Sequence, residues 1–126
     1  MPVRIASLDS IPVQNMPGRD VQWLVTPANL GTENVAVVWL RAPAGAVVRP
    51  MHGHRDTEEV FVVLEGQGEA LVDGETSPFQ KGDAVFFPAN SKHMIRNTGS
   101  GTLVGLGIFS PPTTPASYLI FENEGW

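Results

Sequence analysis

Residues 51–66 read Met-His-Gly-His-Arg-Asp-Thr-Glu-Glu-Val-Phe-Val-Val-Leu-Glu-Gly. Two histidines flank one glycine, and Glu59 follows the second histidine by five residues. Because alternate side chains of an extended chain point to the same face, His52 and His54 are expected to lie side by side. Two neighbouring imidazoles can bind one metal ion, and a carboxylate from the next strand can be a third ligand.

A second stretch supplies a fourth candidate ligand. Residues 82–97 read Gly-Asp-Ala-Val-Phe-Phe-Pro-Ala-Asn-Ser-Lys-His-Met-Ile-Arg-Asn and contain His93. The chain has three histidines, and all of them fall in these two stretches. This confinement favours a shared site over three unrelated, solvated side chains. We therefore predict that one divalent metal ion is bound by His52, His54, Glu59 and His93. Three nitrogens and one carboxylate suit Fe, Mn, Ni, Cu or Zn.

Both stretches resemble the two sequence motifs of the cupin family. Gly45, His52, His54, Glu59 and Gly66 match the first motif, with one extra residue between Gly45 and His52. Gly82, Pro88, His93 and Asn97 match the second motif, in which Asn90 replaces the usual glycine. Asparagine also tolerates the left-handed backbone of a turn, so the departure is mild. The spacing to Gly66 favours Glu59 over Glu58 as the ligand, which leaves Glu58 on the opposite face.

The rest of the chain indicates an all-β protein. Short segments rich in β-branched and aromatic residues predict strands at 21–25, 34–42, 47–54, 59–64, 69–72, 76–80, 84–88, 92–97, 102–109 and 118–121. Asp73-Gly74 predicts a two-residue hairpin turn. Pattern alone leaves a β-sandwich or a barrel open. The cupin resemblance implies a jelly-roll β-barrel, the double-stranded β-helix, with the metal site inside. We expect an N-terminal arm at 1–20, the barrel at 21–110 and a C-terminal tail at 111–126 that packs on the barrel.

Composition restricts the partners. The 126 residues suit one domain, and 42% of them are hydrophobic, which argues against disorder. A formal net charge of -5 argues against binding to nucleic acid or to an anionic membrane surface. Cysteine is absent, so neither disulfides nor thiolate ligands are available. The sequence shows no signal-peptide core and no apolar run long enough to cross a bilayer, and we expect a cytoplasmic protein.

Strand alternation predicts the walls of a pocket beside the metal. Val48 shares a face with the histidine pair, Phe61 and Val63 share one with Glu59, and Ile95 and Asn97 share one with His93. Asn97 has an alternative role, in which it caps the turn that follows it. Most of these neighbours are apolar and few cations fall in phase. The pattern therefore favours a small, largely apolar, oxygenated ligand over a sugar phosphate.

Several functions remain open at this point. The cupin resemblance implies dioxygenases, decarboxylases, isomerases, lyases and non-catalytic binding proteins. Our first expectation is a metal-dependent oxidoreductase of the dioxygenase type, because no output domain is present to report binding. The alternatives are a binding or sensing module without turnover, and a metal-dependent isomerase or lyase. We also expect a homodimer, because residues 59–64 are apolar on both faces, the N-terminal arm is apolar, and cupins commonly pair.

Overall fold

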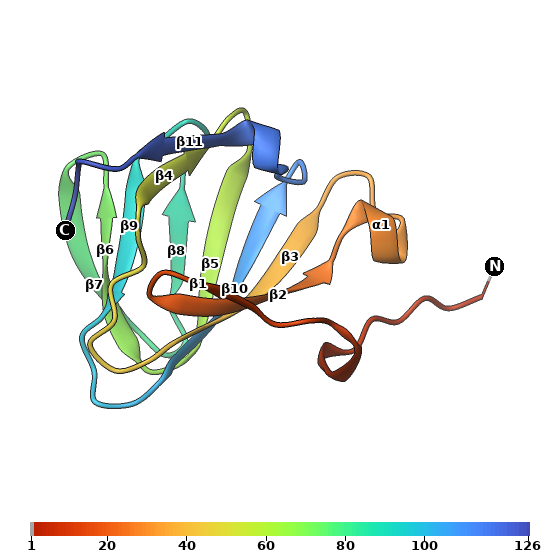
Figure 1. Cartoon of the computed structure of the whole chain (residues 1–126), viewed down its shortest axis with the longest axis horizontal. Helices are drawn as coiled ribbons and strands as arrows, with labels where there is room; N and C mark the ends of the chain where they lie inside the picture. The colour runs from red at the N-terminus through yellow and green to blue at the C-terminus, as the bar shows by residue number, and fades with distance from the viewer. Residues whose placement is uncertain (1) are drawn as a thin grey trace.

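The protein is a jelly-roll β-barrel, as the sequence predicts (Figure 1). The structure is a computed structural model that describes residues 2–126. One sheet has the strand order β1 (Gln14–Met16), β2 (Arg19–Val25), β3 (Ala36–Ala42), β10 (Leu103–Ser110), β5 (Glu58–Glu65) and β8 (Ala84–Phe87). The other has the order β11 (Tyr118–Phe121), β4 (Met51–His54), β9 (His93–Asn97), β6 (Gln67–Val72) and β7 (Glu75–Gln80). All neighbouring strands in these two sheets pair antiparallel.

Helices are short in this fold. The structure contains η1 (Leu8–Ser10), α1 (Pro27–Leu30) and η2 (Pro115–Ser117). Within residues 2–126, no helix has the length and apolar character needed to cross a lipid bilayer.

Alternating burial along the strands shows which side chains face the interior. Every second residue of β3 and of β10 is buried, and the residues between them are half-buried. In β5 the same alternation buries Glu59, Phe61 and Val63 and leaves Val60 and Val62 on the outer face. The buried side chains form an apolar core between the sheets, whose burial is the main favourable contribution to folding. The outer face of β5 is nevertheless also apolar.

Two turns adopt the backbone that their residues predict. Asp73 and Gly74 have φ values of 46° and 88° and join β6 to β7 as a tight hairpin, which is the turn that Asp-Gly favours. Asn90 has a φ of 66°, the left-handed conformation expected of the residue in the glycine position of the second motif. Its side-chain Oδ1 accepts a hydrogen bond of 3.1 Å from Asp56 N. The substitution of asparagine for glycine therefore keeps the turn.

Segments near both ends of the chain pack on the barrel. Residues 2–7 project from the barrel (Figure 1), whereas residues 8–11 lie on the outer face of β2, where Gln22 Nε2 donates to the carbonyls of Leu8 and Ile11. Residues 14–20, which the sequence division places in the arm, form β1 and the start of β2. At the other end β11 pairs with β4, and the guanidinium of Arg96 lies 4.0 Å from the ring centroid of Trp126. Both ends thus add strands to the barrel.

Candidate metal centre

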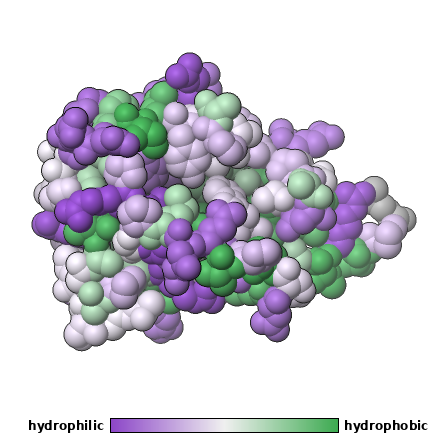
Figure 2. Space-filling model, in the orientation of Figure 1, coloured by the Kyte–Doolittle hydropathy of each residue, from purple (hydrophilic) through white to green (hydrophobic). Residues whose placement is uncertain are grey.

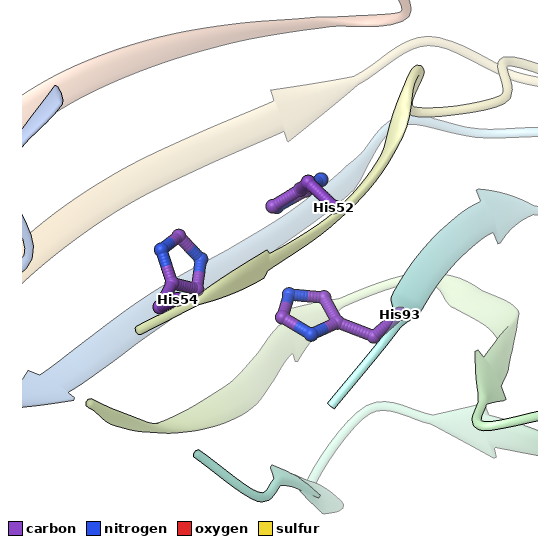
Figure 3. A group of neighbouring side chains, drawn as sticks. All are labelled: His52, His54 and His93. Atoms are coloured by element: carbon purple, nitrogen blue, oxygen red, sulfur yellow. The ribbon is translucent and has the colours of Figure 1, made fainter. Parts of the chain in front are cut away.

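The three histidines converge inside the barrel (Figure 3). His52 and His54 come from β4, and His93 lies directly opposite His52 in the neighbouring strand β9. One ring nitrogen of each histidine lies within 4.8 Å of the others. Glu59 comes from β5 of the opposite sheet. The two sheets together therefore bring the four predicted ligands to one place.

Gly53, between the two histidines, permits this arrangement. A β-carbon at position 53 would collide with the carbonyl oxygen of Ser91. The same close approach lets Asn90 N donate a 3.0 Å hydrogen bond to the carbonyl of His54. Glycine at this position therefore lets β4 press against the loop that precedes β9 and carries His93 toward the pair.

Hydrogen bonds at the far side of two imidazole rings set which nitrogen faces the site. His52 Nδ1 lies 3.0 Å from the carbonyl oxygen of Pro50, which can only accept, so Nδ1 carries the proton. His54 Nδ1 lies 3.0 Å from Thr113 Oγ1, which lies 3.1 Å from Ser117 Oγ. Such partners orient a histidine ligand and leave the Nε2 lone pair for a metal.

The contacts of Glu59 test whether a metal fits. Glu59 Oε1 lies 3.3 Å from His54 Nε2 and 3.4 Å from His93 Nε2. These buried nitrogens nevertheless have no partner with hydrogen-bond geometry in the described part of the chain. Neighbouring ligands of one ion, each about 2.1 Å from it, stand roughly 3.0–3.4 Å apart. The donor set therefore fits a metal ion better than it fits a hydrogen-bonded network.

Burial and charge hold Glu59 and His52 in the protonation states that metal binding requires. Burial alone would raise the pKa of Glu59, but the imidazoles of His54 and His93 outweigh it and lower this pKa to about 2. Burial, reinforced by the neighbouring His93, lowers the pKa of His52 to about 3. At neutral pH, Glu59 is therefore ionised and His52 is neutral. Glu58 is exposed and points away, as predicted.

A cavity of about 550 Å³ adjoins the four residues. Val48, Phe61 and Ile95 line it, as the strand alternation predicts. Val63 and Asn97 do not, and here the structure corrects the sequence-based pocket. Both side chains are buried, but Val63 packs in the part of the barrel that core side chains fill. Strand alternation gives the inward face but not how far along a strand the cavity extends.

Asn97 instead organises a turn, the alternative role considered for it. Its Nδ2 donates to the carbonyls of Ala42, Pro43 and Gly101 at 3.0, 3.1 and 2.8 Å. Its Oδ1 accepts from Gly99 N at 2.8 Å. These bonds satisfy the side-chain amide within the loops, so it has no role at the cavity.

Four polar residues of the cavity were not predicted from the sequence, namely Gln14, Arg19, Thr114 and Tyr118. Tyr118 of β11 pairs with His54 in the strand register, and its ring centroid lies 4.6 Å from that of His54 and 5.7 Å from that of His52. Burial raises the pKa of the Tyr118 hydroxyl, and the carboxylate of Glu59 adds to this. Arg19 of β2 also lines the cavity and is 7% exposed. It adds one cation to a cavity for which few cations were expected.

One signal in the sequence could have revealed Arg19. Val21 and Trp23 line the cavity from the same strand, and Arg19 has the same phase two residues earlier. The predicted strand began at residue 21 and so excluded it. Tyr118 gave no comparable signal, because its contact depends on the pairing of β11 with β4.

Comparison with known proteins agrees with the fold and the motifs. A family model described as a cupin domain matches residues 38–109, more than half of the chain. The chain therefore belongs to the cupin family.

Three relatives illustrate its range. An uncharacterised protein of Methanocaldococcus jannaschii is 36% identical over 57% of this chain and 58% of its own length. Protein SchB of Streptomyces halstedii is 32% identical over 76% of this chain and 69% of its own length. Quercetin 2,3-dioxygenase of Bacillus subtilis is 40% identical, but over only 37% of this chain and 14% of its own length. The chain thus spans about half the length of the first two relatives it matches, at 58% and 49%.

Solved structures show the same fold at lower identity. Pac13, described as a nucleoside dehydratase, superposes with a TM-score of 0.81 over 96% of this chain and 92% of its own, at 14% identity. KdgF from a Halomonas species superposes with a TM-score of 0.76 over 91% of this chain and 99% of its own, at 20% identity. At these identities the likeness concerns the fold alone.

Proposed function

We propose that this protein is a metal-dependent enzyme, an oxidoreductase of the dioxygenase type, that acts on a small, largely apolar, oxygenated molecule. The observation that carries the proposal is the buried set of unpartnered imidazole nitrogens beside Glu59, at the wall of an apolar cavity. The partial likeness to quercetin 2,3-dioxygenase supports the reaction class.

The metal would be held by His52, His54, His93 and Glu59. A redox-active divalent ion such as Fe(II) supplies a centre that can polarise chelating substrate oxygens and admit O₂ chemistry. The protein contributes the donor set, the ring orientations fixed at Pro50 and Thr113, and the ionised carboxylate. An ion held there would adjoin the cavity, so a substrate could reach it, as at catalytic rather than structural metal sites.

The cavity walls govern what can enter. Phe61, Phe87 and Phe109 line the space beside the metal ligands together with Trp23. Such walls exclude bulk water from a reacting molecule and favour an aromatic or alkyl body. The volume of about 550 Å³ suits a small organic molecule.

A metal-dependent lyase or isomerase is the second candidate, and Tyr118 favours it. The hydroxyl-bearing ring of Tyr118 contacts the rings of both His52 and His54. A phenol at that place can hold or deliver a proton to a bound substrate.

Oxygen consumption by Fe(II)-loaded protein tests the proposal. The panel contains aryl and alkyl diketones, enediols and diols, and the control is the His52→Ala variant. The proposal expects consumption of O₂ that depends on substrate and is lost in the variant. Turnover without O₂, or equally well with Zn(II), would assign the protein to the lyases or isomerases. Saturable binding without chemistry across the panel would show a binding module.

A further inference from the structure

We infer that Arg19 is the specificity-determining residue of the cavity and that it selects a carboxylate carried by a mostly apolar body. This inference rests on the proposed function, since it takes the cavity to be the substrate site. It narrows the substrate class from oxygenated molecules in general to small carboxylic acids.

Arg19 is a buried cation in the wall of a largely apolar cavity. Its neighbours in phase along β2, Val21 and Trp23, are apolar and line the same cavity. Burial lowers the pKa of the guanidinium, but arginine stays protonated in proteins. A charge in these surroundings is costly unless it is paired.

The structure offers Arg19 no direct counter-ion. Within residues 2–126, no carboxylate lies within 4.0 Å of its guanidinium. Asp20 is the next residue in sequence, but it is exposed on the opposite face of β2. Glu59 also lines the cavity, and its charge acts on Arg19 only from a distance, where it raises the pKa of the guanidinium against the larger effect of burial. Glu59 Oε1 lies 3.3 Å from His54 Nε2 and 3.4 Å from His93 Nε2.

Backbone carbonyls occupy only one end of the guanidinium. Arg19 Nη1 donates to the carbonyl of Pro17 at 3.0 Å and to that of Arg49 at 2.7 Å. These two bonds use both Nη1 protons and hold the side chain in place. A guanidinium has five N–H donors, so three remain, on Nε and Nη2, with no partner among the described residues.

The remaining donors have the chemistry of a carboxylate receptor. Nε–H and one Nη2–H are parallel, and such a pair matches the two oxygens of a carboxylate. Fixing the other end of the guanidinium removes much of the conformational entropy that binding would otherwise cost. The apolar walls then accommodate the rest of the molecule. A neutral ketone or diol would leave the arginine charge unpaired.

Isothermal titration with a matched pair of probes tests this inference. The probes are 3-phenylpropanoate and its neutral amide, 3-phenylpropanamide, which differ in charge at one end of the same body. Each is titrated into Zn(II)-loaded protein and into protein stripped of metal with a chelator. We expect the carboxylate to bind at least about tenfold more tightly in both forms, because a charge-assisted bidentate pair is stronger than a neutral hydrogen bond.

Two variants test whether Arg19 causes the preference for the carboxylate probe. Arg19→Gln should abolish the carboxylate preference while amide binding changes little, and Arg19→Lys should keep part of it because the charge remains. Circular dichroism and thermal unfolding check that each variant folds, since Nη1 also joins two backbone segments.

Three results would overturn the inference. The first is that the amide binds to the unmodified protein as tightly as the carboxylate does, or that neither probe binds. The second is that the preference for the carboxylate persists in a folded Arg19→Gln variant. The third is that this preference disappears when the metal is removed, which would assign the carboxylate to the ion instead. Because these are binding measurements on the wild-type protein as well as on variants, they stand whether or not turnover is ever found.

Discussion

Gly107 of β10 makes room for the carboxylate of Glu59: a β-carbon at position 107 would lie 2.9 Å from Glu59 Oε2. It would also lie 2.9 Å from Val38 Cγ1, on the adjacent strand β3. We therefore predict that Gly107→Ala displaces the carboxylate and weakens metal binding by roughly tenfold, because a ligand set tolerates little misplacement. Metal affinity is measured by competition with a chromogenic chelator.

Gly101→Ala is the matched control for this change. It adds the same methyl group shortly before β10, where a β-carbon would meet no atom within 4 Å. Equal affinities for the two alanine variants would show that Gly107 does not set the position of Glu59.

The ligand set itself gives the next prediction. His52→Ala and His93→Ala should each lose bound metal while the β-sheet circular dichroism spectrum is retained, because the core of the barrel lies in other side chains. Glu59→Ala should act in the same direction, and its exposed neighbour Glu58 offers a control, Glu58→Ala. Elemental analysis of protein purified without a metal-affinity tag measures the occupancy. Full occupancy in either histidine variant would refute the assignment.

Thr113 supplies a third prediction, concerning ring orientation. Thr113→Val keeps the shape of the side chain but removes the hydroxyl 3.0 Å from His54 Nδ1. Loss of such a partner typically weakens metal binding by about 10–100-fold. Thr113→Ser keeps the hydroxyl and should bind metal nearly as well as the unmodified protein. An unchanged affinity in Thr113→Val would mean that packing alone orients the ring.

A homodimer is the fourth prediction. Val60 and Val62 are on the outer face of β5. Phe86 of the neighbouring strand β8 pairs with Val60 and is 52% exposed. The space-filling view also shows hydrophobic surface along the projecting N-terminal segment (Figure 2), where Ile5 is 80% exposed. Such surfaces usually mark interaction sites. Light scattering at micromolar concentration should give twice the chain mass.

Two variants distinguish the surfaces that could form this dimer. Phe86→Asp should shift the equilibrium toward monomer if the outer sheet face pairs, and Ile5→Asp should do so if the arm pairs. A monomer mass for the unmodified protein would exclude both.

Local patterns predicted the all-β fold and the meeting of the three histidines, and the cupin resemblance supplied the choice of a barrel. Strand alternation and the Asp73-Gly74 turn act over a few residues, and the two motifs carry all three histidines. The choice of Glu59 over Glu58 also followed from spacing and agrees with their burial.

The cavity could not be predicted in the same way, because it depends on contacts between distant segments. Tyr118 reaches the histidines only because β11 pairs with β4, more than sixty residues earlier. Arg19 faces the cavity because β2 extends two residues beyond its apolar stretch. Val63 has the correct phase but a position that core side chains fill.

The cupin-domain match, residues 38–109, divides the residues of the site into two groups. All four candidate ligands lie inside that span, whereas Arg19, Trp23 and Tyr118, which shape the cavity, lie outside it. The segments before and after the span therefore complete a cavity whose candidate metal ligands all lie within the span. Exchange of residues 14–25 between cupins of this size should therefore change ligand preference while the four candidate ligands, and Thr113 beside His54, stay in place.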